Sequence, residues 1–197
     1  MMTNVKPIIV LTLIAAIVSA LIITVYNVTY VDTSGILTDA QAAAVTAIYG
    51  GAAEDYEVVP ADTWQPVLAL SDNADISRVS KVIKRSSDGA LAFEVVVKGY
   101  KDGFDILVGV TDGAVYGVSV VSVGEETPGL GTKTNDPAFL ENFKGISDEA
   151  VIVKSAPAAD NEVQAVTSAT FSSKGVAKAV NIALDAYRTV QQNGGAF

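Results

Sequence analysis

The sequence contains neither cysteine nor histidine among its 197 residues. Without cysteine the chain has no disulfide, no thiolate ligand for an iron–sulfur cluster and no cysteine nucleophile. Without histidine it has no Ser-His-Asp triad, no haem axial histidine and no ordinary zinc site. We therefore expect no metal site and no catalytic residue in the chain itself. Any redox chemistry then requires an organic cofactor.

Positive charge is also scarce. The chain carries 13 Lys and Arg against 22 Asp and Glu, which gives a formal net charge of −9 at pH 7. Proteins that bind nucleic acid usually present clustered positive charge to the phosphate backbone. We therefore expect no nucleic-acid partner.

Charge is absent altogether from residues 7–26, which are twenty mostly apolar residues. A helix rising about 1.5 Å per residue over this length crosses a hydrocarbon layer of roughly 30 Å. Residues 18–20, Val-Ser-Ala, have the pattern of a processing site, so a cleaved secretory signal is the alternative. The apolar run continues for six residues past Ala20, which favours an uncleaved anchor with one transmembrane helix.

The basic residues around this anchor predict its orientation. Lys6 lies on the N-terminal side, and no Lys or Arg follows the apolar run until Arg78. Positive charge is retained on the cytoplasmic side of a membrane. We therefore expect a single-pass protein with a cytoplasmic N-terminus and its soluble domain on the outer or periplasmic side.

Helix signals stand at both ends of the remaining chain. Thr38 and Gln41 have capping-box spacing, and the following alanine-rich run predicts a helix to Tyr49. Asp136-Pro137 predicts another helix start, with Phe139, Leu140 and Phe143 on its buried face. A last helix is predicted after Thr170, to about Gln192, because the apolar residues there recur at helical spacing.

The central third of the chain has the pattern of a sheet. We predict strands at 91–98, 104–110 and 115–123, the second of them half-buried, with a hairpin at Asp112-Gly113. A short strand is predicted at 151–153, and residues 54–80 are assigned mainly to loop. The expected fold is α+β, an antiparallel sheet with flanking helices that follows one N-terminal transmembrane helix. The expected division is a cytoplasmic stub and transmembrane helix (1–30), a helix and connecting segment (31–90), and the domain core (91–197).

Two motifs carry the functional prediction. The threonine turn, residues 166–173, has the sequence Val-Thr-Ser-Ala-Thr-Phe-Ser-Ser and precedes the last predicted helix. A helix N-terminus binds phosphate through its free N–H groups, although a simple helix cap is the alternative. The Glu-Thr-Pro loop, residues 125–133, has the sequence Glu-Glu-Thr-Pro-Gly-Leu-Gly-Thr-Lys. Its two glycines permit close approach of a flat ligand to the backbone, although a plain turn is the alternative.

Together, the two motifs resemble the FMN-binding domain of the G subunit of Rnf electron-transport complexes, which the C subunit of sodium-pumping quinone reductases shares. The resemblance runs from the N-terminal membrane helix through Gly99-Tyr100 and the strand pair after it to the last helix. Ser168 stands where this family usually has glycine, Gln164 where it usually has aspartate, and Gly124 where a histidine often precedes the loop. None of these departures removes the hydroxyl of Thr170.

The resemblance implies a prokaryotic inner-membrane subunit that relays electrons through covalent FMN. The implied attachment is a phosphoester on Thr170, made by a separate flavin transferase, with Lys133 or Lys174 opposing the phosphate charge. The complex would be a ferredoxin:NAD oxidoreductase coupled to Na⁺ or H⁺ translocation, and the partners its other membrane and redox subunits. The implied cofactor-binding residues are Thr170, Thr167, Ser168, Ala169, Glu126, Thr127, Gly129, Leu130, Gly131 and Lys133.

Two alternatives stay open. The first is a component of a sodium-pumping NADH:quinone reductase similar to its C subunit, although those chains usually have extra sequence before the flavin domain. The second is a membrane-tethered binding or scaffold domain without a cofactor. Trp64 and Tyr100 are candidates to pack on a flavin ring, with burial in a core or an interface as the alternative for each.

Overall fold

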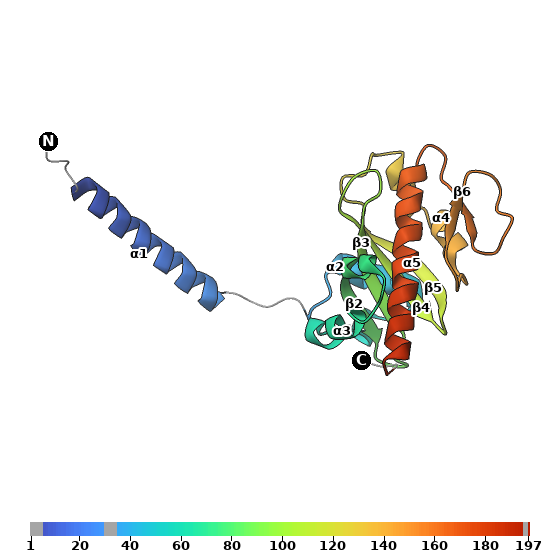
Figure 1. Cartoon of the computed structure of the whole chain (residues 1–197), viewed down its shortest axis with the longest axis horizontal. Helices are drawn as coiled ribbons and strands as arrows, with labels where there is room; N and C mark the ends of the chain where they lie inside the picture. The colour runs from blue at the N-terminus through green and yellow to red at the C-terminus, as the bar shows by residue number, and fades with distance from the viewer. Residues whose placement is uncertain (1–5, 30–34, 195–196) are drawn as a thin grey trace. The chain divides into compact units, whose positions relative to one another are not determined.

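A computed structural model describes residues 6–29, 35–194 and 197 (Figure 1). The chain divides into two units, Met1–Thr33 and Ser34–Phe197. The first unit contains α1 (Lys6–Thr29), whose residues 7–29 are exposed and which is long and apolar enough to cross a membrane. Most of the predicted cytoplasmic stub, residues 1–5, lies outside the described residues. The predicted division of the soluble part at residue 90 stays a prediction.

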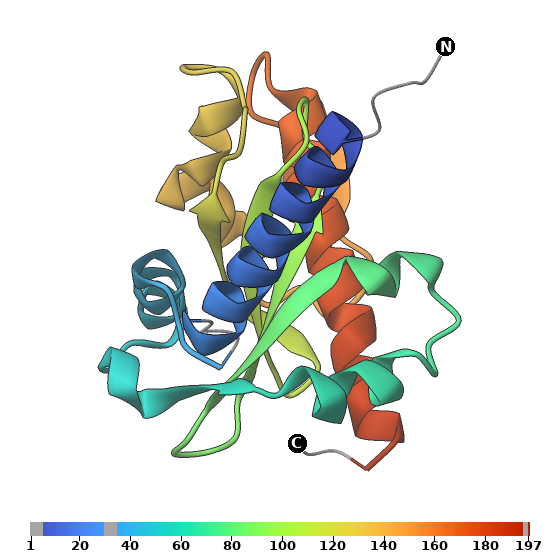
Figure 2. The same ribbon diagram turned by 90° about the vertical axis from the view of Figure 1, so that its left-hand side faces the viewer.

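The second unit is built on a five-stranded antiparallel sheet with the strands in sequence order, β1-β2-β3-β4-β5. Helix α5 runs along one face of the sheet (Figure 1), and the turned view places α2 on the other side (Figure 2). The predicted α+β class is therefore confirmed. The strands are β1 (Tyr56–Val59), β2 (Val79–Arg85), β3 (Leu91–Val97), β4 (Phe104–Thr111) and β5 (Ala114–Ser122).

The two faces of the sheet have separate cores because neighbouring residues of a strand point to opposite sides. Phe93 of β3 packs in the core under α5 (Thr170–Gln192), and Ala92 packs in the core under α2 (Asp39–Tyr49). Residues 106–110 of β4 are buried without interruption. The expectation of a half-buried strand at 104–110 is therefore wrong, since helices cover this strand on both faces.

Residues 54–80 also differ from the prediction, because they are mostly ordered into short elements rather than loop. The elements that begin in this stretch or just before it are η1 (Ala53–Asp55), β1, α3 (Ala61–Leu68), η2 (Ala74–Arg78) and the start of β2. Pro60 stands at the N-cap of α3, where a proline replaces no hydrogen-bonded N–H. Pro60 thus marks the start of this helix, and Pro66 lies inside it.

The segment after β5 contains short elements and a second, small sheet. Its bounds are η3 (Gly131–Asn135), α4 (Pro137–Leu140), η4 (Glu141–Phe143), β6 (Val151–Val153) and β7 (Glu162–Gln164). Pro137 opens α4 as predicted, and Phe139, Leu140 and Phe143 are buried. The predicted strand at 151–153 is present, and it pairs in parallel with β7, which was not predicted.

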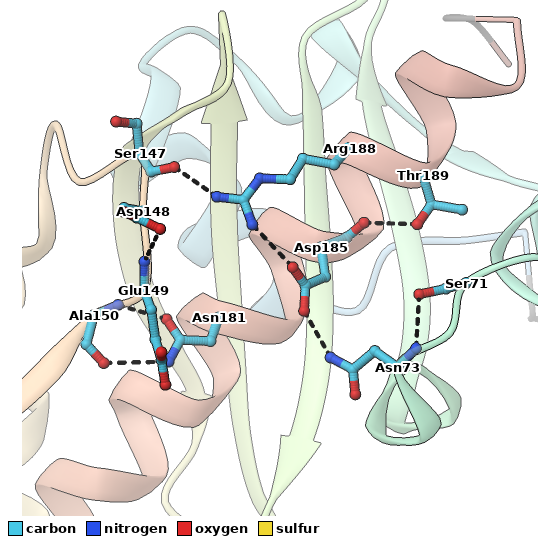
Figure 3. A network of polar contacts seen from close by, with 10 residues as sticks. All are labelled: Ser71, Asn73, Ser147, Asp148, Glu149, Ala150, Asn181, Asp185, Arg188 and Thr189. Atoms are coloured by element: carbon cyan, nitrogen blue, oxygen red, sulfur yellow. Dashed lines mark hydrogen bonds and ion pairs between the residues drawn. The ribbon is translucent and has the colours of Figure 1, made fainter.

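Polar side chains fix α5 to two loops along its length (Figure 3). The amide of Asn181 binds both backbone groups of Ala150, at 2.7 and 3.2 Å. Closer to the C-terminus of the helix, Arg188 donates to the carbonyl oxygen of Ser147 at 2.7 Å, and Asp185 accepts from the side chain of Asn73 at 2.7 Å. These contacts attach the second half of the helix to the loops beside it.

Candidate functional site

Three loops meet at the end of the sheet where β3 ends, β4 begins and β5 ends. They are the hairpin turn after β3 (98–103), the Glu-Thr-Pro loop after β5, and the threonine turn that leads into α5. All three lie at the top of the domain in Figure 1. They enclose a cavity of about 370 Å³, within the usual range for small-molecule sites. Its lining residues are Tyr100, Glu126, Thr127, Leu130, Gly131, Ser168, Ala169, Thr170, Phe171 and Ser172.

Helix α5 begins at this cavity without a side-chain cap. Thr170 is its first residue, and the N-cap residue Ala169 makes no capping hydrogen bond. The first N–H groups of an α-helix have no partner within the helix. Ser168, just before the cap, has φ = +65°, a left-handed conformation that glycine adopts most readily. The helix thus presents free N–H groups and the hydroxyl of Thr170 to the cavity, an arrangement suited to a phosphate group.

Glu126 ties the three loops together. Its side chain is 4% exposed, and its Oε1 atom accepts hydrogen bonds from the backbone N–H groups of Tyr100 (2.7 Å) and Lys101 (3.1 Å). Its Oε2 atom accepts a hydrogen bond from the hydroxyl of Ser172 in the first turn of α5, at 2.7 Å. One buried carboxylate therefore binds residues that lie 25 to 46 positions away from it in the sequence.

Glycines make room for this carboxylate. A Cβ atom on Gly99 would lie 2.3 Å from Oε1 of Glu126, and a Cβ atom on Gly131 would lie 1.9 Å from Oε2. Gly175, in the second turn of α5, has the backbone of Gly99 3.1 Å from the position of its missing Cβ. The absence of a side chain at these positions lets the helix, the hairpin turn and the Glu-Thr-Pro loop approach closely.

The mouth of the cavity is apolar. Tyr100 is 58% exposed, Phe171 69% and Leu130 42%, and the rings of Tyr100 and Phe171 lie 6.5 Å apart at 60°. Large apolar side chains clustered in the open usually mark a binding surface. A polar pocket floor beneath an apolar rim suits a ligand with a charged end and a flat aromatic end.

The structure brings seven of the ten predicted binding residues to this cavity. They are Glu126, Thr127, Leu130, Gly131, Ser168, Ala169 and Thr170. Thr167, Gly129 and Lys133 are not among its lining residues, and Lys174 lines a different groove beside Asp75 and Asn181. Neither lysine proposed to oppose the phosphate therefore lines the cavity.

The other three lining residues are Tyr100, Phe171 and Ser172. Tyr100 lines the cavity, whereas Trp64 is buried in the core under α5. Phe171 and Ser172 were not predicted as site residues, although they belong to the threonine turn. An aromatic residue directly after Thr170, in a turn of otherwise small residues, is the signal that points to Phe171.

Comparison with known proteins finds similarity over the segment that contains this site. Residues 99–185 match the FMN-binding domain family. Over 71% of its length the chain is 29% identical to the G subunit of the Na(+)-translocating ferredoxin:NAD(+) oxidoreductase complex of Acetobacterium woodii, covering 70% of that protein. Over 47% of its length it is 39% identical to the G subunit of the proton-translocating ferredoxin:NAD(+) oxidoreductase complex of Clostridium ljungdahlii, of which it covers half.

Two solved structures are also similar. The crystal structure of Shewanella oneidensis NqrC has a TM-score of 0.49 at 22% identity, with 62% of this chain and 67% of that chain covered. The crystal structure of the C subunit of the Na(+)-translocating NADH-quinone reductase from Parabacteroides distasonis has a TM-score of 0.43 at 24% identity, with 55% and 61% covered.

The matched segment begins at Gly99 in the hairpin turn and includes both predicted motifs and most of α5. The chain is thus similar, over residues 99–185, to proteins with an FMN-binding domain. Among proteins of this kind it is similar to the G subunits of ferredoxin:NAD⁺ oxidoreductase complexes, which confirms the resemblance predicted from the two motifs.

Proposed function

We propose that this chain is a membrane-anchored electron-relay subunit that carries FMN as a phosphoester on Thr170. The observation that carries the proposal is the position of Thr170. It is the first residue of an uncapped helix, it lines the cavity, and it lies inside the segment that matches the FMN-binding domain.

The residues around the cavity fit this cofactor. The free N–H groups of the first turn of α5 are aimed at a phosphate on Thr170, where the helix dipole also favours negative charge. The exposed rings of Tyr100 and Phe171 and the side chain of Leu130 offer apolar surface to a flat heteroaromatic ring. When bound, FMN supplies reversible electron transfer, which no side chain of this chain provides.

Thr170 is favoured over the neighbouring hydroxyls by its surroundings. Ser172 and Ser173 are buried, and their hydroxyls donate to Glu126 and to the carbonyl oxygen of Ala169. Thr167 does not line the cavity, whereas Ser168 does. Thr170 is half-buried at the cavity, with no hydrogen bond described for its hydroxyl. Ser168 is therefore the competing site that an experiment has to distinguish.

Attachment requires an activated donor, because a phosphoester does not form efficiently from an alcohol and a free phosphate in water. The hydroxyl oxygen of Thr170 forms a bond to the flavin-bearing phosphorus of a phosphoric anhydride of FMN. The anhydride P–O bond breaks, the second phosphate leaves with its substituent, and a base accepts the hydroxyl proton. Threonine is a weak nucleophile without such a base. The chain has no histidine to serve as one, so a separate flavin transferase is proposed.

In the assembled complex the chain passes electrons between its flavin and the redox centres of neighbouring subunits. The relatives are named as subunits of complexes that couple ferredoxin:NAD⁺ oxidoreduction to the translocation of Na⁺ or of protons. We propose the same partners and reaction here, with either ion. The helix α1 supports membrane association. The distribution of Lys and Arg around it further supports a cytoplasmic N-terminus and an outer or periplasmic flavin domain.

Intact-mass measurement of the full chain from its native host tests the proposal. We expect one added FMN less one water, a band that fluoresces under ultraviolet light on a denaturing gel, and a modified peptide that contains Thr170. Thr170→Ala should give a dark band and an unmodified mass with the fold retained, whereas the matched control Ser168→Ala should stay bright. Native protein of unmodified mass would overturn the proposal and favour a scaffold. A bright Thr170→Ala band would overturn the choice of residue.

A further inference from the structure

The buried carboxylate of Glu126 binds other parts of the protein, although the residue lines the cavity. The resemblance to the FMN-binding domain implies that Glu126 is one of the residues that bind the flavin. In the structure both of its oxygens are occupied by donors of the protein itself, the N–H groups of Tyr100 and Lys101 and the hydroxyl of Ser172. With 4% of the side chain exposed, little of it is left to meet a ligand.

We infer that Glu126 is a positioning residue, which sets the place of Thr170 for flavin attachment by tying the first turn of α5 to the hairpin turn. This inference rests on the proposed attachment at Thr170. Ser172 stands two residues after Thr170 in the same helical turn, so the bond from Ser172 to Glu126 fixes the turn that carries the reacting hydroxyl. The bonds from the N–H groups of Tyr100 and Lys101 attach the hairpin turn to the same carboxylate, and Tyr100 also lines the cavity.

Three glycines support this role over that of an ordinary buried acid. Gly99 and Gly131 leave space on either side of the carboxylate that a single Cβ would fill, and Gly175 lets α5 approach the hairpin turn. Ser172 is 1% exposed, so loss of its acceptor would leave a buried hydroxyl unpaired. The first turn of α5 would then shift to find another acceptor, and the hydroxyl of Thr170 would move with it.

The test compares Glu126→Ala with the conservative Glu126→Gln. The glutamine oxygen can accept the two N–H bonds and its amide nitrogen can donate to the Ser172 oxygen, because a hydroxyl both donates and accepts. Glu126→Gln should therefore keep the tie and lose only the charge. Alanine removes the tie, and a misplacement of the nucleophile by even 1 Å costs roughly tenfold or more in rate.

Glu94→Ala is the matched control. Glu94 is also a buried carboxylate, at 6% exposure, and accepts a hydrogen bond from the N3 residue of a helix, Gln41 of α2, at 2.8 Å. It lies among the residues under α2 rather than at the cavity. Its removal destabilises the same unit without touching the threonine turn.

The full chain with each substitution is expressed in the native host, and intact mass is followed after induction to give the attachment rate. Amide hydrogen exchange at Tyr100 and Lys101 reports the tie independently of the flavin. We expect wild type, Glu126→Gln and Glu94→Ala to be modified at similar rates, and Glu126→Ala at least roughly tenfold more slowly, with faster exchange at both amides.

Three results would overturn the inference. They are a wild-type rate in Glu126→Ala, an equally slow rate in Glu94→Ala, and a slow rate in Glu126→Gln with both amides still protected. The last would assign the effect to charge rather than to hydrogen bonding. If the wild-type chain is never modified, the proposed function fails instead. Even then, unchanged hydrogen exchange at the Tyr100 and Lys101 amides in Glu126→Ala would refute the link between Glu126 and the hairpin turn.

Discussion

The two long helices of the domain begin in different ways, although their surroundings are alike. In both, the third residue donates a hydrogen bond to a buried glutamate: Gln41 of α2 to Glu94 and Ser172 of α5 to Glu126. Helix α2 also closes its own end with a complete capping box between Thr38 and Gln41. Helix α5 has no side-chain cap at Ala169.

The N-terminus of α2 is thus stabilised by a cap, whereas the N-terminus of α5 keeps N–H groups that the proposed phosphate would meet. A capping box satisfies two N–H groups that would otherwise face solvent. Without one, the N-terminus keeps its attraction for an anion, at the expense of the stability that a cap contributes, about 1 kcal/mol. At α5 two buried contacts hold the first turn without a cap. The hydroxyl of Ser172 donates to Glu126, and the hydroxyl of Ser173 accepts from the N–H of Val166.

The largest expected effect follows from filling the space beside Glu126. In Gly131→Ala the new Cβ would lie 1.9 Å from the glutamate oxygen and 2.9 Å from the hydroxyl of Ser172. We expect a loss of about 1–3 kcal/mol in the free energy of unfolding, typical of overpacking. Flavin attachment should also slow sharply. Urea unfolding of the detergent-solubilised chain and intact mass measure the two effects.

Gly35→Ala is the control for this change, because nothing lies within 4 Å of the position of its missing Cβ and its φ is not positive. It should leave stability and attachment unchanged. If Gly131→Ala lowered stability while attachment continued at the normal rate, the open end of α5 would not depend on the position of Glu126.

Removing the cap of α2 should have a smaller effect of a different kind. Thr38→Ala deletes the side-chain oxygen that accepts from the N–H of Gln41. We expect a loss of about 1 kcal/mol in the free energy of unfolding, as for other N-cap substitutions. Attachment to Thr170 should not change, since α2 covers the other face of the sheet. A slower attachment in Thr38→Ala would show that the two helix ends are coupled.

A smaller gain is expected from Ser168→Gly. Ser168 holds φ = +65°, which costs a serine about 1–2 kcal/mol. Glycine avoids this cost but loses more chain entropy on folding, so a net gain of about 0.5 kcal/mol is expected. Ser168→Ala keeps the strained backbone and should show no gain. Modification of Thr170 should persist in both variants, and a loss in either would give the Ser168 region a direct role in attachment.

Many features of the fold could be predicted from local sequence patterns. The capping box of Thr38 and Gln41, the hairpin at Asp112-Gly113 and the proline start of α4 each depend on a few adjacent residues, and all are present. The cavity also follows in part, because the two motifs that form most of its wall are recognisable by their small residues.

Contacts between distant segments could not be predicted in this way. Nothing local to Glu126 indicates that its carboxylate binds the N–H groups of residues 100 and 101, or that Ser172 completes the tie. The burial of β4 on both faces depends in the same way on where α2 and α5 pack. Short elements such as α3 were not predicted because their prolines are as common in loops as at helix starts.

The smallest expected effect concerns the buried glutamate under α2. Burial raises the pKa of Glu94 above its ordinary value of 4.5, while its hydrogen bond with Gln41 and the charge of Lys81 lower it, and nearby Asp105 raises it. The folded protein therefore binds this proton more tightly than the unfolded chain does. The stability that the protonated group contributes is fully present below pH 4.5 and is lost as the pH rises through the folded pKa.

Glu94→Gln removes this titration and keeps an oxygen that can accept from Gln41. Relative to wild type, the variant should gain stability as the pH rises from 4.5 to 7.5, when urea unfolding is measured in steps across that range. A difference between Glu94→Gln and wild type that stayed constant with pH would mean that Glu94 ionises alike in the folded and unfolded chains.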